Sequence, residues 1–127
     1  MTSIVGDARG QRPSTSADGP GPETLACLFR SFAEPARLAI LRRLAAGDQR
    51  VVDLTRHLGL AQSTVSQHLS CLRECGLVSS RQVGRASLHS LAHPAETSGL
   101  LAAAGQVLAV TDDAVVSCDT YGLASRG

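Results

Sequence analysis

The chain has 127 residues, of which 43% are hydrophobic and 18% charged, and its formal net charge is +1, so it can form one small domain with flanking tails. Two Phe, one Tyr and no Trp leave a core of Leu, Val and Ala, which favours closely packed helices and a homodimer. No apolar run is long enough for a signal peptide or a membrane span, and the four cysteines are too unevenly spaced for a disulfide framework. We therefore expect a cytoplasmic protein with no membrane partner, whose cysteines bind metal or serve thiol chemistry.

Residues 1–22 are rich in Gly, Pro, Ser, Thr and Asp and offer little apolar surface, so a disordered N-terminal tail is expected there. A helical pattern begins at Pro22 and Glu23. Its apolar positions recur at the spacing of one helix face, at Leu25, Leu28, Phe29 and Phe32. Cys27 lies beside this stripe, and we interpret it as packing in the core or at a dimer interface.

Three more helices are predicted before residue 77. One begins at Pro35 and ends at Gly47, a short one covers residues 51–58, and the third covers residues 61–76. The last two are joined by a tight connection that contains Gly59, and the second of them is polar on its outer face. This arrangement is typical of a helix-turn-helix.

The helix predicted at residues 61–76 has two contrasting faces. At about 100° per residue, its apolar residues fall within about 60° of one another and form a buried stripe of Val65, Leu69 and Leu72. The opposite side carries Ser63, Gln67 and Ser70, with Ser66 at its edge. Short hydrogen-bonding side chains near a helix N-terminus suit base edges and phosphates in a major groove.

One flank of this helix carries Thr64, His68, Cys71 and Cys75. Because Cys71 and Cys75 are four residues apart, they are adjacent on the helix surface, where one metal ion could bridge them. The alternative is that both are small buried hydrophobic residues, as free cysteines often are.

After Gly76 the pattern changes to that of strands. Residues 77–81 and 85–91 are predicted to form a β-hairpin with Gly84 in its turn. A hairpin directly after a recognition helix is the wing of a winged helix. Arg81 and Arg85 near its tip can reach phosphates or a minor groove, although an ordinary solvated hairpin is the alternative.

The charge distribution favours contact with DNA over the same region. Residues 30–85 hold nine Arg against four acidic residues and are therefore +5, whereas residues 92–127 hold one Arg against four acidic residues and are −3. The basic charge is thus concentrated where the predicted recognition helix and its neighbours lie, as a phosphate-facing surface requires. A solvated basic face is the alternative.

A last helix is predicted from Pro94 to about Ala109, with a broad apolar surface of Leu100, Leu101, Ala104, Val107 and Leu108. A helix this apolar needs a partner. Pairing with the first helix and with a second copy would form a homodimer, which would bring two recognition helices to a palindromic site. The acidic tail, residues 110–127, carries Cys118 next to Asp119.

This order of elements, together with the string AQSTVSQHLSCLRECGLV at residues 61–78, resembles the ArsR/SmtB family of winged-helix metal-sensing repressors. The resemblance covers about residues 23–109, the expected DNA-binding and dimerisation domain, and is most specific in residues 59–78. It implies a mainly α fold with a β-hairpin wing. It also implies a homodimer that represses transcription from operator DNA and is released when its inducer binds.

Sensor sites differ within that family. One subgroup carries a Cys-Val-Cys-Asp-Leu segment where this chain has residues 50–54, Arg-Val-Val-Asp-Leu, and another uses Asp and His on the last helix, where this chain offers His93 but Gln106. The third subgroup, the CmtR-type cadmium and lead sensors, carries two cysteines four apart in the recognition helix and one in the tail. The present chain is similar to it at Cys71, Cys75 and Cys118.

These observations predict a metal-responsive repressor and not an enzyme, since no phosphate-binding loop, Cys-x-x-Cys motif or acid–base pair is present. Thiolates favour soft ions, so Cd²⁺ or Pb²⁺ is the expected inducer, with Zn²⁺ a further option. Its metal ligands are expected to be Cys71, Cys75 and Cys118. Its contacts to double-stranded operator DNA are expected from Ser63, Thr64, Ser66, Gln67, His68, Arg81 and Arg85. The alternative is a thiol redox switch that uses Cys71 and Cys75 without metal.

Overall fold

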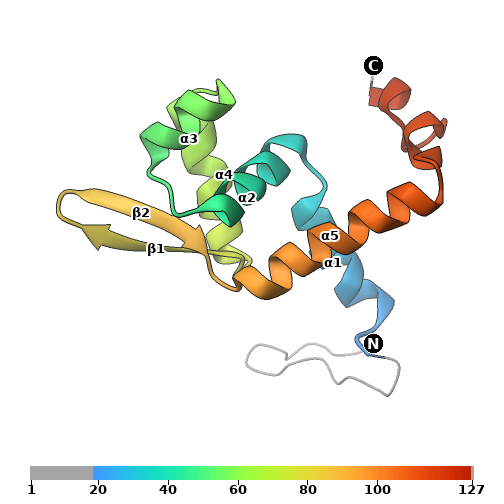
Figure 1. Cartoon of the computed structure of the whole chain (residues 1–127), viewed down its shortest axis with the longest axis horizontal. Coiled ribbons are helices and arrows are strands. Elements are labelled where there is room, and N and C mark those ends of the chain that lie inside the picture. The colour runs from blue at the N-terminus through green and yellow to red at the C-terminus, as the bar shows by residue number, and fades with distance from the viewer. Residues whose placement is uncertain (1–18, 127) are drawn as a thin grey trace.

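The computed structural model describes residues 19–126 and is mainly helical, with one antiparallel hairpin (Figure 1). Its elements are α1 (Pro22–Phe32), α2 (Pro35–Ala46), α3 (Val51–Leu58), α4 (Gln62–Glu74), β1 (Val78–Val83), β2 (Ala86–Leu91), α5 (Pro94–Val110) and two short 3₁₀ helices, η2 (Ala114–Ser117) and η3 (Leu123–Arg126). The predicted fold class, a winged helix-turn-helix, is confirmed. Most of the predicted N-terminal tail, residues 1–18, lies outside the described part of the chain.

Three helices begin where a proline fixes the first turn, namely α1 at Pro22, α2 at Pro35 and α5 at Pro94. The predicted helix at residues 61–76 is α4 and is slightly shorter, because Cys75 forms its C-cap. The Cys75 N–H still donates to the carbonyl of Cys71 at 3.0 Å. Gly76 then turns the chain with a φ of +80°, a left-handed conformation that glycine adopts without strain.

The core lies where α2, α3, α4 and β2 meet, and its buried apolar side chains are Phe32, Ile40, Leu41, Leu44, Leu54, Val65, Leu69, Leu72, Val78 and Leu91. All three members of the predicted stripe on α4, Val65, Leu69 and Leu72, have an exposed fraction of 0%. Burial of this stripe fixes which side of α4 faces outward.

The hairpin pairs Val78 with Leu91 at its base and Val83 with Ala86 at its tip. Its first strand is therefore one residue longer than predicted, and its second strand is one residue shorter. Gly84 and Arg85 form the two-residue turn, and Gly84 has a φ of +63°. At the base, the backbone of His89 exchanges two hydrogen bonds with Gln49, at 2.8 and 2.9 Å, which ties the hairpin to the segment between α2 and α3. His89 is buried, and burial together with the charge of Arg73 lowers its pKa.

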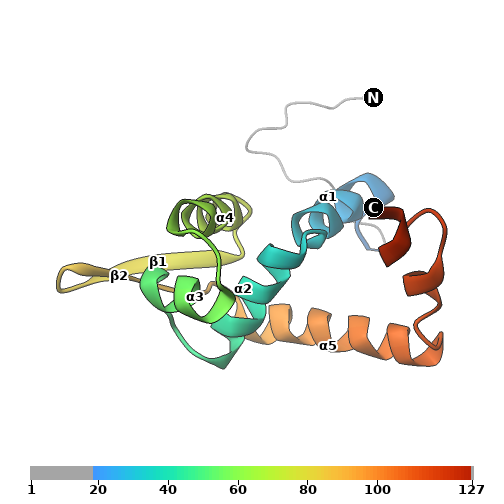
Figure 2. The same ribbon diagram turned by 90° about the horizontal axis from the view of Figure 1, so that it is seen from above.

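Helix α5 runs away from the core, so the hairpin and the C-terminal 3₁₀ segment lie at opposite ends of the molecule (Figures 1 and 2). Apolar side chains remain exposed on α1 and α5, among them Phe29 at 53% and Val107 at 60%. Within residues 19–126, every helix is too short or too polar to cross a membrane.

Candidate nucleic-acid interface and thiol pair

The outer face of α4 presents polar side chains of the kind that the sequence predicts for a DNA-reading helix. Ser63, Ser66 and Gln67 are exposed, and Thr64 is half-buried. These residues occupy the first half of α4, where free backbone N–H groups and the positive end of the helix dipole favour contact with phosphates. The surface is therefore accessible and chemically suited to a DNA groove.

His68 lies on the flank of α4 and faces the start of α2. Its Nε2 atom is 3.8 Å from Oε1 of Glu34, and its side chain is only 19% exposed. The same Oε1 atom accepts a hydrogen bond from the backbone N–H of Arg37 at 3.0 Å. This hydrogen bond, and more weakly the charge of His68, lowers the pKa of Glu34. The structure thus places His68 near a carboxylate that also caps α2, and the predicted contact of His68 with DNA stays a prediction.

Both predicted arginines of the hairpin are exposed, but their surroundings differ. Arg85 occupies the turn at the tip. Arg81 lies on β1, where its Nη1 atom is 3.1 Å from Oδ2 of Asp48. Contact between Arg81 and a phosphate must therefore compete with this ion pair.

Cys71 and Cys75 are neighbours on the flank of α4, as predicted, with Cys71 half-buried and Cys75 exposed. Burial raises the pKa of the Cys75 thiol, and the charge of Cys71 and a hydrogen bond to it raise that pKa further, whereas Arg37 acts in the opposite direction. Two adjacent thiols resist ionising together. A cation between them removes this repulsion, so the pair fits a thiolate-binding metal ion.

Cys118 lies in a compact turn after η2. Its Sγ atom accepts a hydrogen bond from the backbone N–H of Tyr121 at 3.4 Å, and this bond, followed by one from Thr120, lowers the pKa of the thiol. The turn requires Gly122, because a Cβ atom there would clash with the carbonyl oxygens of Val116 and Cys118. The sulfur of Cys118 thus has backbone N–H donors directed at it, chiefly those of Tyr121 and Thr120.

The three predicted ligands do not meet within one chain. Throughout residues 19–126, no group of three or more His, Cys, Asp or Glu side chains is placed to hold a metal ion. The thiol pair is on α4, whereas Cys118 lies beyond the far end of α5 (Figure 1). A site that uses all three cysteines therefore needs Cys118 from a second copy or a movement of the tail.

Cys27 is exposed on α1, where Nη2 of Arg30 donates to its Sγ atom at 3.3 Å. Packing in the core of a single chain, one of the two predicted roles of Cys27, is therefore wrong. The dimer-interface role is compatible with this exposure.

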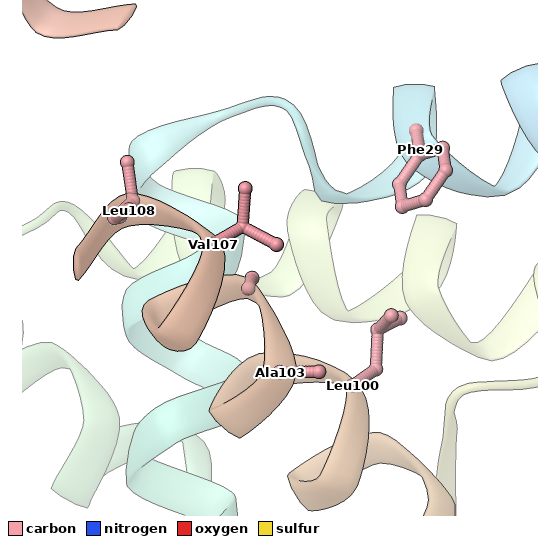
Figure 3. Close-up of a pocket in the computed structure, with 6 residues that line it drawn as sticks. Phe29, Leu100, Ala103, Val107 and Leu108 are labelled. Atoms are coloured by element: carbon pink, nitrogen blue, oxygen red, sulfur yellow. The ribbon is translucent and has the colours of Figure 1, made fainter. Parts of the chain in front are cut away.

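The exposed apolar side chains of α1 and α5 face one another across a pocket of about 490 Å³ (Figure 3). Its lining residues are Phe29, Leu100, Ala103, Ala104, Val107 and Leu108. Apolar surface of this kind is characteristic of an interface that a partner covers.

Sequence reasoning missed Glu34, Arg37 and Asp48, which contact or surround the predicted site residues. Glu34 carried a local signal as the residue before the proline that opens α2. Nothing local, however, indicated its contact with His68, because the two residues are distant in sequence.

Comparison with known proteins places these features among bacterial regulators. Residues 34–80 match the family model described as bacterial regulatory protein, arsR family. The chain is 46% identical over 91 residues to the transcriptional regulator CmtR of Mycobacterium tuberculosis, an alignment that covers 70% of this chain and 75% of CmtR. It is 35% identical over 99 residues to the probable mercury resistance operon repressor of Streptomyces lividans, covering 78% of each.

The fold is likewise similar to a solved structure. The crystal structure of Rv0081 from Mycobacterium tuberculosis superposes with a TM-score of 0.67 at 39% sequence identity. The superposition covers 75% of this chain and 98% of Rv0081.

Proposed function

Because the chain belongs to the ArsR family of bacterial regulatory proteins, whose members are transcriptional regulators and not enzymes, we propose that it is a metal-responsive repressor. The apo homodimer binds operator DNA. When its cysteine thiolates bind a soft metal ion, the protein is released from the DNA. One observation carries this proposal. The exposed polar face and the thiol pair lie on the same helix, α4.

In this proposal, DNA is contacted by the exposed face of α4 and by the hairpin. Base edges are contacted by Ser63, Ser66 and Gln67, with Thr64 beside them. The phosphate backbone of the flanking DNA, or its minor groove, is contacted by Arg81 and Arg85. The accessible polar face of α4 supports this assignment, because its apolar stripe is fully buried and so fixes the orientation of the polar residues.

The homodimer is formed through α1 and α5. The apolar pocket between these helices and the exposed Phe29 and Val107 support this assignment, since a second copy would bury them. A two-fold arrangement presents two α4 helices to a palindromic operator.

The inducer is bound by Cys71 and Cys75, which are joined by Cys118 of the partner copy or of the same chain. The name of one relative, the probable mercury resistance operon repressor of Streptomyces lividans, supports a metal inducer. All proposed ligands are thiolates, which favour Cd²⁺ or Pb²⁺, with Zn²⁺ as the weaker option. Because ligation and DNA reading share α4, metal and DNA weaken each other's binding by the same factor, as linkage requires.

Fluorescence anisotropy of the reduced apo protein with its own promoter DNA tests the proposal, in titrations with Cd²⁺, Pb²⁺ and Zn²⁺. Ultraviolet absorption of the same samples reports thiolate-to-metal charge transfer. The expected result is tight apo binding that is lost with Cd²⁺ or Pb²⁺, together with a charge-transfer band whose intensity corresponds to about three thiolates per metal ion. If DNA binding ignores every metal but is lost with peroxide, the thiol redox switch replaces this proposal.

A further inference from the structure

On the flank of α4, the side chain of His68 lies close to the corner where α1 ends and α2 begins. Its ring is mostly covered, with a side-chain exposed fraction of 19%, and its Nε2 atom lies 3.8 Å from Oε1 of Glu34. The largely covered His68 side chain is less accessible to a DNA groove than the exposed Ser66 and Gln67.

Glu34 itself is held firmly at this corner. It is the N-cap of α2, where its Oε1 atom accepts the N–H of Arg37 at 3.0 Å. Arg37 in turn closes the end of α1, with its Nε atom donating to the carbonyl of Ser31 at 2.8 Å and its Nη2 atom to that of Arg30 at 3.1 Å. The carboxylate that faces His68 therefore belongs to a hydrogen-bonded joint between two helices.

The position of His68 along α4 gives this contact a functional consequence. His68 follows Gln67 on the exposed face by one residue and precedes Cys71 by three, so it lies between the proposed DNA contacts and the thiol pair. A contact there constrains α4 at a second place, in addition to the buried apolar stripe that fixes its outward face. Small displacements of a reading helix cost affinity, because hydrogen bonds to base edges tolerate little error in position.

We propose that His68 is a positioning residue, which anchors α4 to the α1–α2 corner through Glu34 and thereby holds the recognition helix in its DNA-binding orientation. This inference rests on the proposed function only in that the protein binds operator DNA. It reassigns His68 from reading bases to holding the helix that reads them.

A double-mutant cycle on the full-length reduced apo protein tests the anchor, with Glu34→Gln, His68→Gln and the double variant. Glutamine at position 34 keeps an oxygen that can accept the Arg37 N–H but removes the charge. DNA affinity is measured by anisotropy on the promoter fragment. Each single variant is expected to weaken DNA binding ~3-fold to 10-fold, and the double variant no further, because contacting residues are not additive.

Three controls separate the anchor from other roles. Glu34→Asp keeps a good N-cap but shortens the reach toward His68, so it is expected to lose DNA affinity as Glu34→Gln does. Thermal unfolding and far-ultraviolet circular dichroism report the stability and helix content of every variant. A loss of capping alone would lower these two quantities. Ser66→Ala combined with Glu34→Gln is expected to be additive, because Ser66 does not touch the corner.

Two results would overturn the proposal. If the effects of Glu34→Gln and His68→Gln multiply, His68 acts independently of Glu34, as a direct DNA contact would. If neither single variant changes DNA affinity in a folded protein, the contact does not position α4. The cycle uses no metal, so it can fail independently of the proposed function. The proposed metal response fails instead if the wild-type protein binds its promoter but does not respond to Cd²⁺.

Discussion

The guanidinium of Arg81 lies 3.1 Å from the carboxylate of Asp48, so the hairpin is joined across the surface to the segment between α2 and α3. Both side chains are substantially exposed, at 58% and 39%. An exposed ion pair of this kind contributes only ~0–1 kcal/mol to folding. The pair nevertheless neutralises the charge of Arg81, which the proposed function assigns to a phosphate contact.

Asp48→Asn is therefore expected to strengthen DNA binding. The change frees Arg81 and removes one negative charge near the proposed interface, so the dissociation constant should fall ~2-fold to 5-fold at low salt, with a smaller gain at high salt. Anisotropy at several salt concentrations checks this. Asp113→Asn makes the same charge change at the far end of α5 and should leave affinity unchanged; equal gains in both variants would assign the effect to net charge.

Cys71→Ser is expected to separate metal sensing from DNA binding. Serine is close to cysteine in shape but supplies no soft thiolate, so apo DNA affinity should stay within about 2-fold while Cd²⁺ no longer releases the DNA. Anisotropy with and without Cd²⁺ measures both quantities. Cys27→Ser is the matched control and should respond to Cd²⁺ as the wild type does. Normal release by Cys71→Ser would rule out the thiol pair as the sensor.

Val107→Glu is expected to disrupt the proposed dimer. A carboxylate in the apolar pocket between α1 and α5 would have to be buried without a partner, which is costly. Analytical ultracentrifugation should show a shift from dimer to monomer, accompanied by a loss of DNA affinity. Val52→Glu, at a valine of α3 that is 47% exposed, should leave the oligomeric state unchanged. A wild-type monomer would contradict the dimer directly.

The buried His89 predicts how stability depends on pH. Burial lowers its folded-state pKa below the ordinary value of 6.5, so between the two values the unfolded chain binds more protons. Stability should therefore fall as pH drops through about 6.5 and level off below the folded pKa. Urea unfolding from about pH 8 down to about pH 5 measures this slope. His89→Leu should flatten it, and an unchanged slope would show that another group titrates there.

The elements that local patterns specify were predicted closely. Prolines marked the starts of α1, α2 and α5, and the apolar stripe of α4 is fully buried as expected. The prediction of a regulator instead of an enzyme is confirmed by the relatives. These features depend on neighbours a few residues apart, which periodicity and capping rules capture.

The contacts that modify the site were not predictable in the same way. Glu34 with His68 and Asp48 with Arg81 join residues that are distant in sequence, and their pairing follows from how α2 packs against α4 and the hairpin. The separation of Cys118 from the thiol pair within one chain also depends on the direction of α5. The sequence identifies these side chains by type, but tertiary packing determines which of them meet.

The turn around Cys118 alters the thermodynamic cost of recruiting this residue. The turn is already formed in the folded chain, with the Tyr121 N–H at the sulfur and Gly122 closely packed, so the entropy of ordering this turn is lost when the chain folds. A thiol on a disordered tail would instead lose conformational entropy each time it bound a ligand. In the proposed metal site, Cys118 would therefore act as a donor whose turn is already formed, and the entropic cost that remains would be that of bringing this turn to the other two thiols.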